Sequence, residues 1–116
     1  MEQSSAIAAL SALAHPGRLD VFRLLVRAGA EGMAAGDIAR EVGALPNTLS
    51  ANLNILSAAG LVTSERRGRS IIYSAAYDRM GRLLAFLMED CCAGAPEICA
   101  PAVAAANRAA CEVGGC

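Results

Sequence analysis

The hydrophobic period of the chain changes directly after Gly60, and this change constrains the fold more than any other feature. Before it, apolar residues recur at helical spacing in four segments. After it come two short segments rich in Val, Thr, Ile and Tyr, residues 61–65 and 70–74, which flank Arg66-Arg67-Gly68-Arg69. A glycine between two such segments is typical of the tip of a β-hairpin. We therefore predict a mainly α domain with one small β-hairpin.

Two helices are predicted at the start of the chain. The first runs to about residue 13, with Ser4 and Ser5 as N-cap candidates. Its apolar stripe consists of Ile7, Leu10 and Leu13. The second begins at Pro16, because proline suits the first helical position, and is closed by glycines at positions 29 and 32. Its apolar side consists of Leu19, Phe22 and Val26, widened by Val21 and Leu25.

The next two helices are short and lie close together in the sequence. One spans about residues 34–42 and ends at Gly43, and residues 44–47 form a tight turn into another helix that ends at Gly60. Two short helices joined in this way form the helix-turn-helix pattern. A fifth helix spans about residues 77–90, and its apolar face consists of Met80, Leu83, Leu84 and Leu87.

The core of such a domain is thin, because the chain holds 26 alanines but only 13 leucines. Alanine forms helices well but buries little area. The apolar stripes of the first and fifth predicted helices have no obvious partner within so small a chain. We therefore expect these two helices to form a symmetric homodimer with a second copy.

Membrane and secreted locations are not expected. Hydrophobic residues make up 55% of the 116 residues, but no apolar run approaches the ~20 residues that a membrane helix needs. The first five residues are polar apart from Met1 and carry no positive side chain, so they do not resemble a secretory signal. We expect a cytoplasmic protein with no membrane partner.

The fourth helix and the hairpin together indicate binding to double-stranded operator DNA. If Leu49, Leu53 and Leu56 face inward, short hydrogen-bonding side chains lie on the opposite side, which suits base edges in a major groove. The candidate DNA contacts on this helix are Asn47, Thr48, Ser50, Asn52 and Asn54. The hairpin adds Arg66, Arg67 and Arg69 as phosphate contacts. A helix-turn-helix followed by a basic hairpin is the order of a winged helix.

Several motifs within residues 6–90 resemble the ArsR/SmtB-type metalloregulators. Residues 13–25 (LAHPGRLDVFRLL) look like the opening signature of that family, residues 47–56 and 58–62 resemble its recognition helix and the exit from it, and residues 67–73 are similar to its wing. The resemblance implies a homodimeric winged-helix repressor, not an enzyme, that leaves its operator when a toxic metal or metalloid binds. One departure is Asn52, where the family usually has histidine.

All five cysteines lie in the last quarter of the chain, at positions 91, 92, 99, 111 and 116. Without an export signal, we interpret them as reduced thiols. Seven extended residues span at most ~25 Å, so a loop can return Cys99 to Cys91 and Cys92 within one chain. Three thiolates form a soft site, and trivalent arsenic accepts three of them as a trigonal pyramid.

This arrangement resembles the ArsR repressors whose arsenite cysteines lie just past the last dimer helix. The resemblance implies As(III), or Sb(III), as an inducer bound by Cys91, Cys92 and Cys99. Two other inducer sites of the family are absent, since no cysteine precedes Cys91 and the single histidine is His15. We therefore divide the chain into a winged helix-turn-helix domain, residues 1–90, and a metalloid-binding tail, residues 91–116.

Alternatives to this inducer stay open. A thiol redox or persulfide sensor, or a repressor selective for methylated trivalent arsenic, needs only two of the three cysteines. A small thiol enzyme is disfavoured, because it needs an anion-cradling loop beside its nucleophilic cysteine and no such loop precedes any cysteine here.

Overall fold

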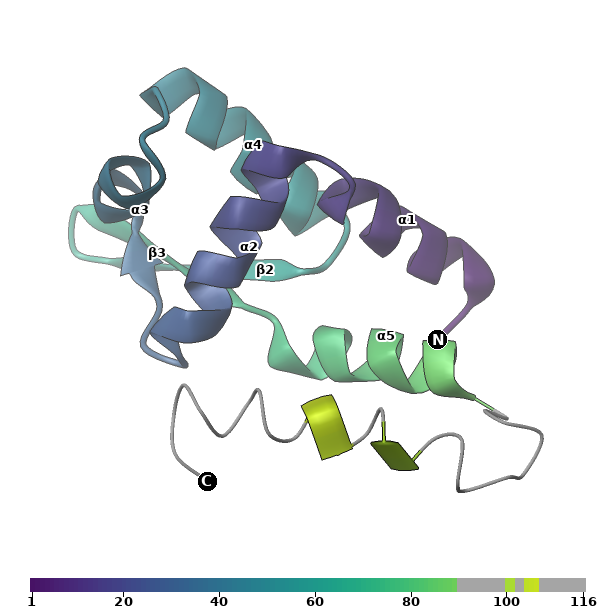
Figure 1. Cartoon of the computed structure of the whole chain (residues 1–116). Helices are drawn as coiled ribbons and strands as arrows, with labels where there is room; N and C mark the ends of the chain where they lie inside the picture. The colour runs from purple at the N-terminus through teal and green to yellow at the C-terminus, as the bar shows by residue number, and fades with distance from the viewer. Residues whose placement is uncertain (90–99, 102–103, 107–116) are drawn as a thin grey trace. The chain divides into compact units, whose positions relative to one another are not determined.

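The computed structural model describes residues 1–89, 100–101 and 104–106 (Figure 1). The chain divides into two compact units, Met1–Leu83 and Leu84–Cys116. The helices are α1 (Gln3–Leu13), α2 (Pro16–Ala28), α3 (Ala35–Val42), α4 (Pro46–Ala58) and α5 (Tyr77–Met88), and the strands are β1 (Met33–Ala34), β2 (Val62–Arg67) and β3 (Ser70–Ala75). The predicted mainly α fold with a small β-hairpin is confirmed. Within the described ranges, every helix is too short or too polar to cross a membrane.

The junction of α1 and α2 is held by side chains that bond to the ends of the two helices. His15 is the N-cap of α2, and its Nδ1 accepts hydrogen bonds from the backbone N–H groups of Gly17 at 3.1 Å and Arg18 at 3.4 Å. Arg18 in turn donates from Nε to the carbonyl of Ala12 at 2.6 Å, at the end of α1. A cation is favourable at that end because helix carbonyls point there. His15 therefore positions the start of α2.

The first helix differs from its prediction at its cap, and its buried face consists of alanines. It begins at Gln3 with Glu2 as N-cap and no side-chain cap bond, so the serines at positions 4 and 5 lie within the helix and do not cap it. Its buried residues are Ala6, Ala9 and Ala12, while Ile7 and Leu10 are exposed. The small alanine side chains let α1 approach the core closely, which leaves its larger residues outside.

The core lies where α2, α4 and the sheet meet. Helix α2 packs against both α4 and β3 (Figure 1). The large apolar core residues are Val21, Phe22, Leu25, Ile38, Leu49, Leu53, Leu56, Leu61, Val62 and Leu83. The predicted apolar side of α2 is only partly buried, since Phe22 lies in the core but Leu19 is 40% exposed. The neighbouring Val21 and Leu25 occupy the buried side of α2 in its place.

The sheet has three antiparallel strands in the order β1-β3-β2. The two-residue strand β1 was not predicted; it pairs Met33 with Tyr73 and Ala34 with Ile72. Gly32, which the sequence suggested as a helix stop, instead allows β1 to approach β3. It has a φ of +70°, and a Cβ there would lie 2.4 Å from the carbonyl oxygen of Tyr73. Only a glycine fits this backbone position.

The first turn of α5 is attached to the end of α2 and to the segment that follows α4. The hydroxyl of Tyr77 donates to the carbonyl of Val26 at 2.9 Å, and the N–H of Ala76 donates to the carbonyl of Leu61 at 2.8 Å. Gly60 has a φ of +77°, and a Cβ there would lie 2.9 Å from Nε of Arg79. The predicted apolar face of α5 is divided, because Leu83 is buried whereas the other leucines of the helix, Leu84 and Leu87, are exposed.

Candidate nucleic-acid interface

The turn between α3 and α4 is set by a glycine and a proline. Gly43 caps α3 in the left-handed conformation with a φ of 67°, and the N–H of Ala44 donates to the carbonyl of Ala39 at 3.1 Å. Leu45 is then the extended N-cap of α4, and Pro46 occupies its first turn. The residue before a proline avoids the helical region, so the chain must change direction here. The two helices form the predicted helix-turn-helix.

Helix α4 presents the expected inner and outer sides. Leu49, Leu53 and Leu56 are all buried. Four of the five predicted base-contacting residues are exposed: Asn47, Thr48, Ser50 and Asn54. These four side chains are available to a ligand and remain predicted DNA contacts.

Asn52 does not belong to that exposed face. It is only 7% exposed, and a Cβ on Gly17 would lie 3.1 Å from its Nδ2, so it packs against the start of α2. Position 52 follows Leu49 by three residues and precedes Leu56 by four, which places it on the buried side of a helix. The structure therefore places Asn52 away from the exposed side of α4, and its contact with DNA stays a prediction.

The hairpin carries its three arginines differently from the prediction. Strand β2 continues through Arg66 and Arg67, which pair with Ile71 and Ser70, so only Gly68 and Arg69 form the turn. Gly68 has a φ of +63°, which suits a tight turn between antiparallel strands. All three arginines are exposed.

The two strand arginines lie on opposite faces of the hairpin, because successive residues of a strand alternate. Arg66 shares a face with Ile71, its cross-strand partner, and with Tyr73. Arg67 shares the other face with Glu65 and donates from Nη2 to a carboxylate oxygen of Glu65 at 3.2 Å. The bond to Glu65 was not predicted, although two residues that are two positions apart share a face wherever a strand includes both.

A hollow of about 370 Å³ joins α4 to the hairpin. Ser50 lines it from α4, and Arg69 lines it from the hairpin turn. Its other lining residues are Ala34, Ala35, Gly36, Ser70, Ile71 and Tyr73. The hairpin lines the hollow from both of its faces, since Ile71 and Tyr73 belong to the face of Arg66 and Ser70 is the cross-strand partner of Arg67. Two predicted DNA-contacting groups, one on the helix and one on the hairpin, therefore border a single concave surface.

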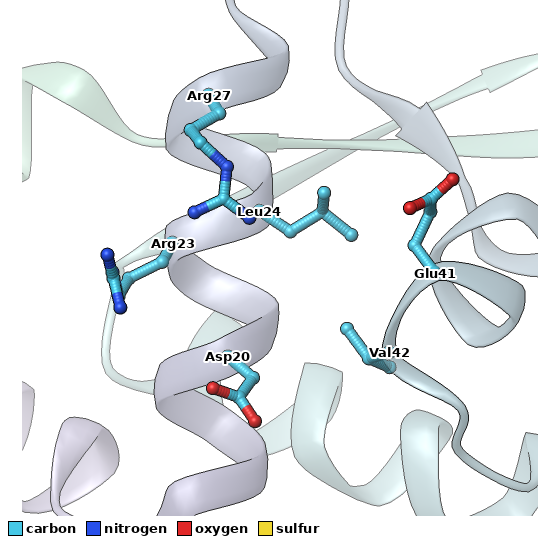
Figure 2. A pocket seen from close by; sticks show the side chains of 6 residues that line it. All are labelled: Asp20, Arg23, Leu24, Arg27, Glu41 and Val42. Atoms are coloured by element: carbon cyan, nitrogen blue, oxygen red, sulfur yellow. The ribbon is translucent and has the colours of Figure 1, made fainter. Parts of the chain in front are cut away.

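A second hollow lies between α2 and α3 (Figure 2). It measures about 260 Å³, and Leu24 and Val42 point into the gap between the two helices. Its charged residues are Asp20, Arg23, Arg27 and Glu41, all of them exposed. Such a mixture of solvated charges is typical of a protein surface, and no buried acid, base or nucleophile lines this hollow.

The predicted inducer site lies outside the described residues, because Cys91, Cys92 and Cys99 fall in the range 90–99. Cys111 and Cys116 fall in the range 107–116 and lie outside them as well. Within the described ranges, no group of three His, Cys, Asp or Glu side chains is placed to hold a metal ion.

Comparison with known proteins agrees with this geometry. A family profile for a helix-turn-helix domain matches residues 13–65. Nodulation protein NolR of Rhizobium meliloti is 38% identical over 80 residues, which cover 69% of this chain and 63% of NolR. The chain thus spans less than two thirds of the length of NolR. The HTH-type transcriptional regulator YgaV of Escherichia coli is 31% identical over 91 residues, which cover 78% of this chain and 88% of YgaV.

A solved structure supports the same assignment. The solution structure of Mb0332 from Mycobacterium bovis superposes with a TM-score of 0.62 at 33% identity, and the match covers 73% of this chain and 76% of that one. That protein is described as a homodimeric winged helix-turn-helix DNA-binding domain and a possible ArsR-family transcriptional regulator. In this chain α3 and α4 supply the helix-turn-helix, and the β2-β3 hairpin supplies the wing. The chain therefore belongs to the ArsR family of winged helix-turn-helix transcriptional regulators.

Proposed function

We propose that this protein is a repressor that binds operator DNA as a homodimer and releases it when trivalent arsenic or antimony binds to its cysteines. The observation that carries the DNA-binding part is the concave surface bordered by Ser50 of α4 and Arg69 of the wing. The description of Mb0332 as a homodimeric DNA-binding domain supports the same interpretation. Such a repressor acts on DNA in the cytoplasm.

In the proposed complex, α4 enters the major groove and the wing lies along the phosphates. The exposed Asn47 and Ser50 contact base edges, since amide and hydroxyl groups match the donors and acceptors there. The arginines of the wing contact phosphates, which positions the protein without reading sequence. This division of roles can be measured, because phosphate contacts depend on salt and base contacts depend on sequence.

The proposed dimer covers apolar side chains that the single chain leaves in solvent. Ile7 and Leu10 of α1 and Leu84 and Leu87 of α5 are all exposed, while smaller alanines of α1 fill the core. Burying these side chains against a second copy stabilises the protein, and a two-fold dimer matches a two-fold operator. Light scattering at micromolar concentration should give twice the 11.8 kDa of one chain. A monomer at that concentration would refute the dimer.

The proposed inducer binds to Cys91, Cys92 and Cys99, which follow α5 directly in the sequence. Drawing three thiolates onto one ion reorganises the chain at the end of α5. The first turn of α5 bonds to α2 through Tyr77 and adjoins Gly60, just past α4, through Arg79. A change in the position of α5 can therefore be transmitted to α2 and to the end of α4 through these contacts. Moving occupancy from 99:1 bound to 99:1 free requires about 5.5 kcal/mol of differential affinity.

The experiment is a DNA-release titration of the full chain with arsenite, methylarsenite, cadmium, zinc and a polysulfide. Serine at any one of the three positions should preserve DNA binding but abolish or severely blunt release by arsenite. Serine at Cys111 or Cys116 is the matched control and should change little. Linkage also requires operator DNA to weaken arsenite binding by the factor by which arsenite weakens DNA binding.

A two-cysteine inducer gives a different result in the same titration. If the Cys99→Ser protein still releases DNA at wild-type arsenite concentrations, the three-thiolate site is wrong. Release by polysulfide or by methylarsenite alone, abolished by changing either of only two cysteines, would then identify the redox or the methylarsenite alternative.

A further inference from the structure

Leu45 is a large apolar side chain that the fold leaves in solvent at the start of α4. It is 74% exposed, which is the largest exposed fraction among the large hydrophobic residues of the described chain. It precedes Pro46 and has the extended backbone of an N-cap, with φ −69° and ψ 149°. A leucine cannot cap a helix, and no side-chain cap bond is formed here. Leu45 therefore contributes little to the core and nothing to the cap.

The position of Leu45 separates it from other exposed aliphatic residues of the protein. Ile7 and Leu10 lie on α1, one of the proposed dimer helices. Ile55 lies on α4, but it lines a different hollow together with Ala8 and other residues of α1. Leu45 instead lies two residues before Asn47, at the end of α4 whose side chains contact base edges in a helix-turn-helix complex.

We propose that Leu45 is a specificity-determining residue that contacts the 5-methyl group of a thymine in the major groove. This inference rests on the proposed DNA-binding function. The thymine methyl is the one apolar group that base pairs display in the major groove, so it is the chemical match for an exposed leucine there. Pro46 restricts the backbone of Leu45, which lowers the entropy lost when the side chain is held against a base.

The test removes the methyl group from the DNA and the leucine from the protein, separately and together. The full chain is first used to enrich its preferred duplex from random DNA. Each thymine of that duplex is then replaced by deoxyuridine, which lacks the 5-methyl group. For wild-type protein, one position per half-site should weaken binding about four-fold, equivalent to ~0.8 kcal/mol for one buried methyl-sized group.

The Leu45→Ala substitution changes both subunits of the proposed dimer. This protein should therefore bind the thymine duplex as weakly as wild type binds the duplex with deoxyuridine at that position in both half-sites, and should show no further weakening there. Ile55→Ala is the matched control, since Ile55 is a 42% exposed aliphatic residue on the same helix; it should discriminate thymine from deoxyuridine as wild type does. Leu45→Asn provides a residue able to cap α4, so the loss of discrimination should appear there without any loss of folding.

Two results separate this inference from the function on which it rests. If no duplex is enriched, the proposed DNA-binding function fails. If a duplex is enriched but Leu45→Ala and wild type respond equally to deoxyuridine at every position, the thymine contact is refuted and the DNA-binding function stands.

Discussion

Helix α4 and the wing bring polar side chains to one surface by different geometries. On the helix, residues three and four apart share a side, so Asn47, Ser50 and Asn54 are exposed while Asn52 is buried beside Gly17. On the wing, successive residues alternate between faces. Arg66 and Arg67 therefore lie on opposite faces of the hairpin, and Arg67 bonds to Glu65. Each region therefore contains one predicted DNA contact that has another partner in the free protein. Asn52 packs against the start of α2, and Arg67 bonds to Glu65.

Helix α4 and the wing also differ in the part of the DNA that they recognise. The exposed groups of α4 are neutral amides and hydroxyls, which can distinguish base edges. The wing carries cations, which bind any phosphate and release counterions from DNA. Changes to the two regions should therefore alter different properties of DNA binding, and the following predictions begin with the largest expected effect.

The largest effect on DNA affinity is expected when the arginines of the wing are removed. Replacing Arg66, Arg67 and Arg69 together with alanine should weaken binding to every DNA sequence. The dependence of log K on log salt concentration should flatten by about 0.9 for each phosphate that the protein no longer neutralises. Affinities for an operator and for an unrelated duplex, measured over a range of salt, check this. An unchanged affinity and salt slope would show that the wing does not lie on the phosphates.

Next in size is the removal of a base-reading side chain from α4. Asn47→Ala or Ser50→Ala should cost about 1–3 kcal/mol on the preferred operator, roughly 5- to 150-fold in affinity. The salt slope should remain that of wild type, because the arginines that meet the phosphates are unchanged. Enrichment of preferred sequences by each variant checks the expected relaxation at specific base pairs. Uniform weakening on all sequences would contradict base reading by α4.

A smaller effect distinguishes the buried asparagine of α4 from an exposed one. Asn52→Ala should lower the free energy of unfolding by about 1 kcal/mol, because Asn52 packs against the start of α2, and should leave the preferred sequence unchanged. Asn54→Ala is the matched control and should change stability by no more than about 0.5 kcal/mol. Denaturant unfolding and sequence enrichment measure the two effects. A shift in the preferred operator for Asn52→Ala would show that Asn52 contacts DNA.

The smallest effect tests the two faces of the wing. Arg66→Gln should weaken DNA binding more than Arg67→Gln, since Arg67 is bonded to Glu65 in the free protein. The difference should be less than about 1 kcal/mol, the usual size of an exposed ion pair. Glu65→Gln should strengthen binding, because it releases Arg67 and removes a negative charge from a surface that meets phosphate. Equal weakening by both arginine variants would remove the distinction between the two faces.

The sequence was sufficient to predict those features that depend on the conformation of a few neighbouring residues. Pro46 and Gly43 predicted the helix-turn-helix junction, and the period of Leu49, Leu53 and Leu56 predicted the buried side of α4. Gly68 predicted the tip of the wing. Pro16 predicted the start of α2, where His15 forms the cap bonds. Each of these features depends on residues only a few positions apart.

What the sequence by itself determined about this protein is the order of its elements and the kind of surface they present. The tertiary structure decided which side of each element meets the core. It placed alanines rather than Ile7 and Leu10 of α1 inside, left Leu19 in solvent, and paired β1 with β3, a strand that follows two helices later in the chain. It also brought Ser50 and Arg69 to one hollow. The reason is physical: hydrophobic period and turn chemistry are local, whereas burial depends on which distant segments pack together and how closely their side chains allow them to approach.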